Sequence, residues 1–133
     1  MFAGVADTHS VLWYLFGDPR LSTPAKTFID EAAKASRKIA LSSISLAEVV
    51  YLVEKQRIPP NAFDDLRQVL GNPDHVFEET PLTLRVVEAM QQVPRDAVPD
   101  MPDRIVAATA IFLGVPLLSR DGRIRASNVR MAW

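Results

Sequence analysis

The sequence contains no cysteine and only two histidines, His9 and His75. Without cysteine the protein has no disulfide, no thiolate nucleophile and no cysteine-ligated zinc, and two histidines are too few for a three-histidine zinc site. The lack of cysteine fits a reducing compartment without requiring one. Carboxylates are therefore the side chains that remain for metal binding or acid–base chemistry.

Long apolar segments and a basic N-terminal segment are missing as well. Residues 1–7 lack the basic region and the apolar run of a secretory signal. The longest uncharged stretch, residues 105–119, is shorter than a membrane span and is interrupted by Gly114 and Pro116. We therefore expect a cytoplasmic protein that has no contact with a membrane.

Neither sign of charge is in excess. Sixteen acidic and fifteen basic residues give a net charge of -1, so the molecule as a whole does not attract nucleic acid, and such binding requires a local patch. A chain of 133 residues with 48% hydrophobic residues is long enough for one core. We expect a single domain over residues 1–133.

Segments typical of strands alternate with segments typical of helices. Strands are predicted at residues 2–6, 38–42, 75–78, 115–119 and 129–132, and helices at residues 10–16, 22–36, 45–56, 62–70, 80–93 and 103–113, with a proline-rich loop at 94–102. This alternation predicts an α/β three-layer sandwich, in which a mostly parallel sheet of four to five strands is flanked by helices. In such a fold the carboxyl ends of strands and the N-termini of helices share one edge, where ligands bind.

Four carboxylates fall at this predicted edge. Asp7 follows the first strand, Glu48 is placed in the first turn of the helix after the second strand, Asp103 begins the last long helix, and Asp121 follows the fourth strand. Carboxylates drawn together repel one another, and a divalent cation relieves the repulsion. Ligation by oxygen alone selects Mg²⁺ or Mn²⁺, and either ion suits water activation at a phosphodiester.

Each of these carboxylates also has a purely structural explanation. Asp7 and Asp103 suit helix caps, Glu48 suits a capping box with Ser45, and Asp121 suits an Asp-Gly turn. Taken singly, the structural explanations are favoured. Four carboxylates at one predicted edge favour the joint hypothesis of a metal site.

Residues next to these carboxylates are open to two interpretations. Thr8 either supports the site by hydrogen bonding or only caps a helix, and Asp100 either joins the carboxylates or is a solvated loop residue. For His9 a structural role is favoured. The aromatic residues between positions 13 and 16 lie on a helix that is apolar on every side, which favours core or protein interface over the stacking of RNA bases.

Basic residues gather toward the C-terminus. From Arg104 onward the chain has five arginines and one acidic residue, a local balance of +4. Arg104, Arg120 and Arg123 fall next to the predicted carboxylate edge and are candidates for contacts with RNA phosphates, with Arg125 nearby. The alternative is a solvated basic face that pairs with acids elsewhere.

Four segments, in this order, resemble the four motifs of PIN-domain ribonucleases, and most closely those of the VapC-type toxins of bacterial VapBC toxin–antitoxin systems. These segments are residues 5–13 with 17–22, residues 43–49, residues 103–110 and residues 117–121. Any one motif is weak evidence. All four in order, spanning the chain from Val5 to Arg123, are strong evidence.

The resemblance implies a parallel α/β fold and endonucleolytic cleavage of RNA that depends on Mg²⁺ or Mn²⁺. By motif position Asp7, Glu48, Asp103 and Asp121 match the catalytic, metal-binding quartet of the family, and Ser119 matches its small hydroxyl residue. The resemblance also implies a homodimer and a cognate VapB-type antitoxin. The C-terminal segment of that antitoxin is expected to lie over the helices after the second strand and to reach the site.

One departure from the family pattern and one alternative function remain. Residues 98–102, Val-Pro-Asp-Met-Pro, lack the His-Arg-Asp-Pro sequence of many relatives, so no basic loop residue is assigned a role. An aspartyl phosphatase is disfavoured because no second aspartate follows Asp7 by two positions, and a receiver domain because no lysine follows Lys55. The alternative to a ribonuclease toxin is a PIN-like scaffold that binds RNA or protein without cleaving it.

Overall fold

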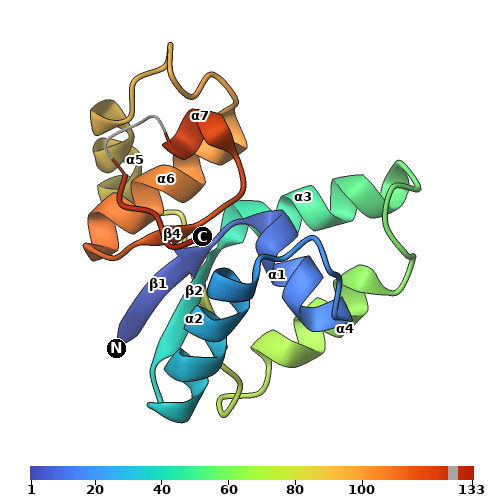
Figure 1. Cartoon of the computed structure of the whole chain (residues 1–133). Coiled ribbons are helices and arrows are strands. Elements are labelled where there is room, and N and C mark those ends of the chain that lie inside the picture. The colour runs from blue at the N-terminus through green and yellow to red at the C-terminus, as the bar shows by residue number, and fades with distance from the viewer. Residues whose placement is uncertain (126–128) are drawn as a thin grey trace.

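A parallel β-sheet forms the centre of the protein in the computed structural model, which describes residues 1–125 and 129–133 (Figure 1). Over these residues the sheet has four strands, β1 (Phe2–Ala6), β2 (Lys38–Ser42), β3 (Phe77–Thr80) and β4 (Leu117–Leu118), in the order β3-β2-β1-β4. All three strand pairs are parallel. The predicted parallel α/β sheet is therefore confirmed.

Helices cover both faces of the sheet (Figure 1). One face packs against α1 (Thr8–Phe16), α2 (Thr23–Lys34), α3 (Ser43–Glu54) and α4 (Ala62–Leu70). The other face packs against α5 (Leu84–Ala89), the short 3₁₀-helix η1 (Met90–Gln92), α6 (Met101–Leu113) and α7 (Gly122–Arg125). This arrangement is the three-layer sandwich that the sequence predicts.

Alternate residues of the central strands enter two separate cores, because successive side chains of a strand point to opposite faces. In β2, Ile39 and Leu41 join the core beneath α1, α2 and α4, whereas Ala40 joins the core beneath α5 and α6. Both sides of the sheet are thus buried, which explains why these strands are continuous apolar runs rather than alternating patterns.

No helix in the described part of the chain is long and apolar enough to cross a membrane. Helices α1 and α6 end at glycines. Gly17 ends α1 with φ 64° and Gly114 ends α6 with φ 68°, both in the left-handed region that favours glycine. The C-terminal ends predicted for these two helices are confirmed.

The predicted start of α3 was wrong. The cap is Ser42, whose Oγ accepts a hydrogen bond from the Ile44 backbone N–H at 3.2 Å, and the helix begins at Ser43. Ser45 is therefore fully buried inside the first turn and does not form a capping box, and Glu48 lies in the second turn rather than the first. The strand passes into the helix without a loop, because a short polar residue at the strand end already serves as the cap.

Several boundaries in the second half of the chain also differ from the prediction. Strand β3 begins at Phe77, later than predicted, helix α5 begins at Leu84, and α6 begins at Met101 with Asp100 as its cap. Strand β4 has two residues. In place of a last strand at residues 129–132, the described residues show one isolated bridge, between Leu117 and Met131.

The predicted turn at Asp121 and Gly122 is instead followed directly by α7, which begins at Gly122. The last two residues of the predicted loop at 94–102 belong to α6. Pro102 fits in the first turn of the helix, because a backbone N–H at this position has no partner within the helix.

Candidate active site

A cleft of about 440 Å³ opens where the carboxyl ends of β1 and β4 meet α1, α3 and α6. Five carboxylates line it, and we call them the acidic cluster: Asp7, Glu48, Asp100, Asp103 and Asp121. They come from four separate parts of the chain. The structure thus brings together the four carboxylates that the sequence places at this edge, and it adds Asp100.

Asp7 lies between β1 and α1 and is held by hydrogen bonds with β4 and within α1. Its backbone N–H donates to the Leu118 carbonyl at 3.1 Å, which continues the pairing of β1 with β4. Its Oδ1 accepts from the Ser10 backbone N–H at 2.9 Å, which caps α1. A carboxylate has two oxygens, so the cap leaves Oδ2 for another ligand. The structural and functional interpretations of Asp7 are therefore compatible.

Glu48 is held by a pair of buried hydroxyl groups. The Thr8 hydroxyl lies 2.6 Å from Glu48 Oε1 and 2.9 Å from the Ser45 hydroxyl. An ionised carboxylate only accepts, so the single Thr8 proton goes to Glu48 and the Ser45 hydroxyl donates to Thr8. This chain joins the start of α1 to α3 and fixes the direction of the Glu48 side chain. The cap of α1 is Asp7 and not Thr8, whose hydroxyl instead contacts a carboxylate of the acidic cluster.

Asp100 and Asp103 lie together at the start of α6. Asp100 Oδ1 accepts from the Asp103 backbone N–H at 3.1 Å and so caps the helix. Burial, together with the negative charges of the other carboxylates of the acidic cluster, raises the pKa of Asp103 to about 7. The pKa of Glu48 is also raised, mainly by burial, with the Thr8 hydrogen bond opposing the change. The carboxylates thus oppose one another's ionisation.

The acidic cluster fits a hard divalent cation in its chemistry. All its donors are oxygens, which suit Mg²⁺ or Mn²⁺, and a cation would relieve the repulsion that, after burial, raises the pKa of Asp103. Among the described residues, no three histidine, aspartate or glutamate side chains already converge on one ion position. Mg²⁺ keeps several waters and takes only one or two carboxylates directly, so it does not need a closed protein cage.

Ser119 is fully buried just after β4, and its Oγ accepts from the Asp121 backbone N–H at 3.0 Å. This hydrogen bond fixes the turn that carries Asp121 into the cleft. The small hydroxyl residue therefore has a positioning role for the backbone next to the acidic cluster.

The arginines predicted as phosphate contacts have different placements. Arg120 lines the cleft. Arg104 does not, because its Nη2 donates to the backbone carbonyls of Met90 at 2.9 Å and Val93 at 3.1 Å, which tie α6 to η1. It follows Asp103 by one helical position and so faces a different side of α6. The side chains of Arg123 and Arg125 lie outside the described residues.

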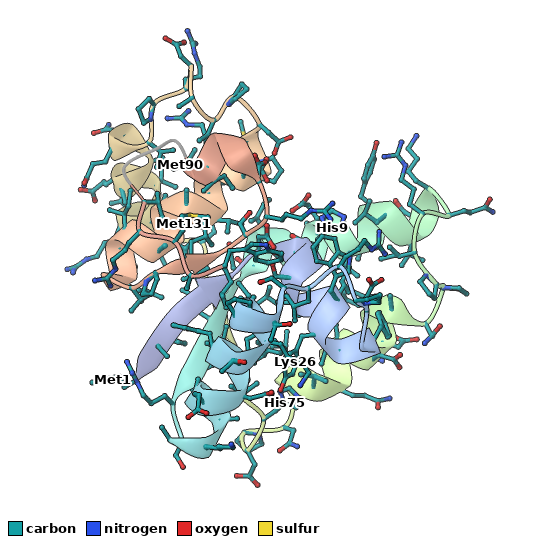
Figure 2. All side chains as sticks on the ribbon, viewed as in Figure 1. Met1, His9, Lys26, His75, Met90 and Met131 are labelled. Carbon is teal, nitrogen blue, oxygen red and sulfur yellow. The ribbon has the colours of Figure 1, made fainter. Side chains whose placement is uncertain are left out.

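Four residues that were not predicted as site residues also line the cleft: His9, Trp13, Arg20 and Val106. Trp13 is 8% exposed and belongs to the core, as its apolar helix predicts, yet its ring edges the cleft. Arg20 lies in the segment 17–22, which resembles part of a family motif. This resemblance is the feature of the sequence that could have indicated a site role for Arg20. Figure 2 shows His9 and His75 well apart, and only His9 is near the cleft.

The parallel three-layer fold with an acidic cleft at the carboxyl edge of its sheet defines an α/β protein with one candidate catalytic centre. Residues 5–128 match the family model of the PIN domain, and the chain belongs to the PIN-domain family. The family that the motifs predict is therefore confirmed.

Individual relatives agree with this assignment. The chain is 30% identical over 120 residues to "Ribonuclease VapC22" of Mycobacterium tuberculosis (strain ATCC 25618 / H37Rv), and this match covers 90% of this chain and 88% of the relative. The fold of this chain is similar to that of VapBC2 from Rickettsia felis, which was solved bound to a DNA fragment from its promoter. The TM-score is 0.70, with 17% identity over 96% of this chain and 95% of that one.

Two other solved structures share the fold. A toxin–antitoxin complex from Klebsiella pneumoniae has a TM-score of 0.61 and 23% identity over 92% of this chain and 90% of that one. FitAcB from Neisseria gonorrhoeae has a TM-score of 0.64 and 19% identity over 96% of this chain and 95% of that one. At these identities the likeness concerns the fold.

Proposed function

We propose that this protein is a metal-dependent endoribonuclease and acts as the toxin of a type II toxin–antitoxin pair. The observation that carries the proposal is the acidic cluster, in which five carboxylates share one cleft and the pKa of Asp103 is raised to about 7. A raised carboxylate pKa in a cleft is typical of functional sites. The relationship to a protein named as a ribonuclease supports RNA as the substrate.

Mg²⁺ or Mn²⁺ would be held by Asp7, Glu48, Asp103 and Asp121, with Asp100 beside them. When bound, the ion supplies charge neutralisation at a phosphodiester and a lowered pKa for its water. The chain itself supplies orientation. The Thr8 hydroxyl holds Glu48, and the cap at Ser10 holds Asp7.

Arg120 lines the same cleft and would bind an RNA phosphate, with Arg123 as a second candidate. Arg104 is removed from this role because its guanidinium is bound to backbone carbonyls. The RNA contacts proposed from the structure therefore concentrate around the end of β4.

The proposed protein partner is inferred from the related solved structures. A VapB-type antitoxin is proposed because one related structure is a VapBC complex and another is described as a toxin–antitoxin complex. A homodimer and a cytoplasmic location are proposed with it. Copurification of this chain with the product of an adjacent small reading frame tests the antitoxin; a monomer that brings down no such product contradicts it.

The alternative function, a PIN-like scaffold that binds without cleaving, is disfavoured because all four predicted quartet carboxylates reach the cleft. The decisive experiment is cleavage of RNA by the purified protein with Mg²⁺ or Mn²⁺, with and without a chelator. Wild type is compared with Asp7→Asn, Asp103→Asn and the exposed control Asp64→Asn on α4. Cleavage should require the metal and survive only in wild type and the control. Cleavage that persists in both cleft variants would refute the mechanism.

A further inference from the structure

Two guanidinium groups lie over one indole ring at the cleft. The Arg20 Cζ is 5.1 Å from the centroid of the Trp13 ring, and the Arg120 Cζ is 4.9 Å from it. Trp13 belongs to α1, Arg20 to the loop that follows α1, and Arg120 to the segment that follows β4. All three residues line the cleft together with the acidic cluster. We call this group the Trp13 stack.

The indole ring serves the two cations rather than a nucleic acid base. Trp13 is only 8% exposed, and its ring also meets His9 at 5.7 Å and Trp133 at 6.2 Å between centroids. A base therefore has little ring surface on which to stack. A guanidinium over an aromatic face is attracted by the ring quadrupole, and the stacking leaves its in-plane N–H groups directed outward.

One carboxylate offsets part of the charge of the stack. Asp18 Oδ1 accepts from Arg20 Nε at 3.1 Å, and Asp18 Oδ2 accepts from Arg20 Nη2 at 2.7 Å. This two-point contact fixes the plane of the Arg20 guanidinium. Arg120 makes no hydrogen bond through its guanidinium within the part of the chain that the structure describes. Two cations with one anion leave a net charge of +1 at the mouth of an acidic cleft.

Fixed planar cations at the mouth of an acidic cleft suit a phosphodiester chain. The acidic cluster by itself repels RNA, and a positive group at its rim lowers that repulsion where the strand enters. Guanidinium groups bind phosphate oxygens through two parallel hydrogen bonds, and such contacts position a strand without recognising its sequence.

We propose that Arg20 and Arg120, held on the Trp13 ring, form a phosphate subsite that binds the backbone of single-stranded RNA next to the phosphate placed at the acidic cluster. This subsite rests on the proposed ribonuclease function and adds to it a positioning device in which Trp13 and Asp18 act through the two arginines. The subsite contacts phosphate, so it does not select a base.

The test measures RNA binding separately from RNA cleavage. The Asp7→Asn protein in Mg²⁺ is titrated against a short fluorescent single-stranded RNA of mixed sequence, and anisotropy is followed over a range of salt concentrations. Arg20→Gln and Arg120→Gln are made in that background. Arg57→Gln, an exposed arginine beyond the end of α3, is the matched control. Thermal unfolding of each variant shows that it is folded.

Arg20→Gln and Arg120→Gln should each weaken RNA binding roughly tenfold, as expected for a lost charge-assisted contact. It should also reduce the slope of log K against log salt by about 0.7, the value for one phosphate of a single strand. The control should change neither quantity. If Arg20→Gln and Arg120→Gln both bind RNA as tightly as the Asp7→Asn parent, the proposed subsite is overturned.

A conservative variant tests the stack itself. Arg120→Lys keeps the charge but loses the planar group that stacks on Trp13, so it should retain most of the salt slope and recover only part of the affinity. Full recovery by lysine would overturn the role of the stack.

The two proposals fail in different ways. Arginine-dependent RNA binding without cleavage by wild type refutes the ribonuclease alone. Cleavage by wild type together with unchanged binding by both glutamine variants refutes the subsite alone.

Discussion

The two sides of the cleft are built in opposite ways. In the acidic cluster, Glu48 and Asp103 lie within helices, Asp7 and Asp100 cap helices, and Asp121 lies in the irregular segment after β4. Hydrogen bonds with backbone or buried hydroxyl groups hold Asp7, Glu48 and Asp100. In the Trp13 stack, both arginines lie outside helices and strands and are exposed, and an aromatic ring and one surface carboxylate hold them. Helices and their caps thus fix four of the five groups that repel one another, whereas the groups that would attract the substrate are on exposed segments outside helices and strands.

This difference predicts different kinetic consequences for the two sides, which is the largest effect expected. Asp103→Asn should lower kcat by at least about a hundredfold with little change in RNA affinity, because it removes a group that acts at the reacting phosphate. Arg120→Gln should raise KM by about tenfold and leave kcat nearly unchanged. Steady-state cleavage of a labelled RNA measures both quantities. Equal losses of kcat in the two variants would erase the distinction between the sides.

The hydroxyl chain behind Glu48 should have an intermediate effect. Thr8→Val keeps the shape of a side chain that is 3% exposed but removes the donor at 2.6 Å from Glu48. We expect about a tenfold increase in the Mg²⁺ concentration required for half-maximal cleavage, because outer hydrogen bonds orient metal-binding carboxylates.

Thr8→Ser should restore the normal Mg²⁺ requirement, since serine keeps the donor. Direct Mn²⁺ titration checks the same change without relying on activity. An unaltered metal requirement in Thr8→Val, with a folded protein, would show that the hydroxyl is only structural.

The smallest effect concerns stability in the absence of metal. The pKa of Asp103 is raised from 3.8 to about 7 in the folded protein. Its contribution to stability is therefore fully present below about pH 4 and is lost as the pH rises through about 7. Asp103→Asn removes this loss. It should raise the free energy of unfolding of the metal-free protein by about 1–2 kcal/mol at pH 8, a figure reduced for the solvent exposure of the group.

Urea unfolding of wild type and Asp103→Asn in a chelator, at pH 4 and pH 8, tests this prediction. The free energies of unfolding of the two proteins should be nearly equal at pH 4, and that of the variant should be higher at pH 8. Titrating groups outside the acidic cluster are the same in both proteins, so their effects on stability cancel in the comparison. A variant that is less stable than wild type at pH 8 would contradict the electrostatic account of the acidic cluster.

The same contrast explains what the sequence predicts about the site. Asp7, Glu48, Asp103 and Asp121 are predictable because each lies near the end of a strand or the start of a helix, and parallel topology carries such positions to one edge. This holds even for Glu48, whose helix begins two residues before the predicted capping box. Errors of a few residues in helix boundaries do not move a side chain to another edge of the sheet.

The Trp13 stack and Arg104 show where such prediction ends. Arg20 and Arg120 meet over Trp13 only through tertiary packing of two loops far apart in the sequence. Arg104 is close to Asp103 in sequence, yet the phase of α6 directs it to the carbonyls of Met90 and Val93. Local pattern indicates which element carries a residue, whereas the partner of a long flexible side chain depends on what the fold packs against it.

The central claim is that the acidic cluster binds a divalent metal ion, and Mn²⁺ binding followed by electron paramagnetic resonance tests it most directly. The signal of free Mn²⁺ should fall as wild-type protein is added, and Mg²⁺ should restore it by competition. Asp7→Asn and Asp103→Asn should bind at least about tenfold more weakly, while Asp64→Asn on α4 should behave as wild type. Equal Mn²⁺ binding by wild type and both cleft variants would contradict the account.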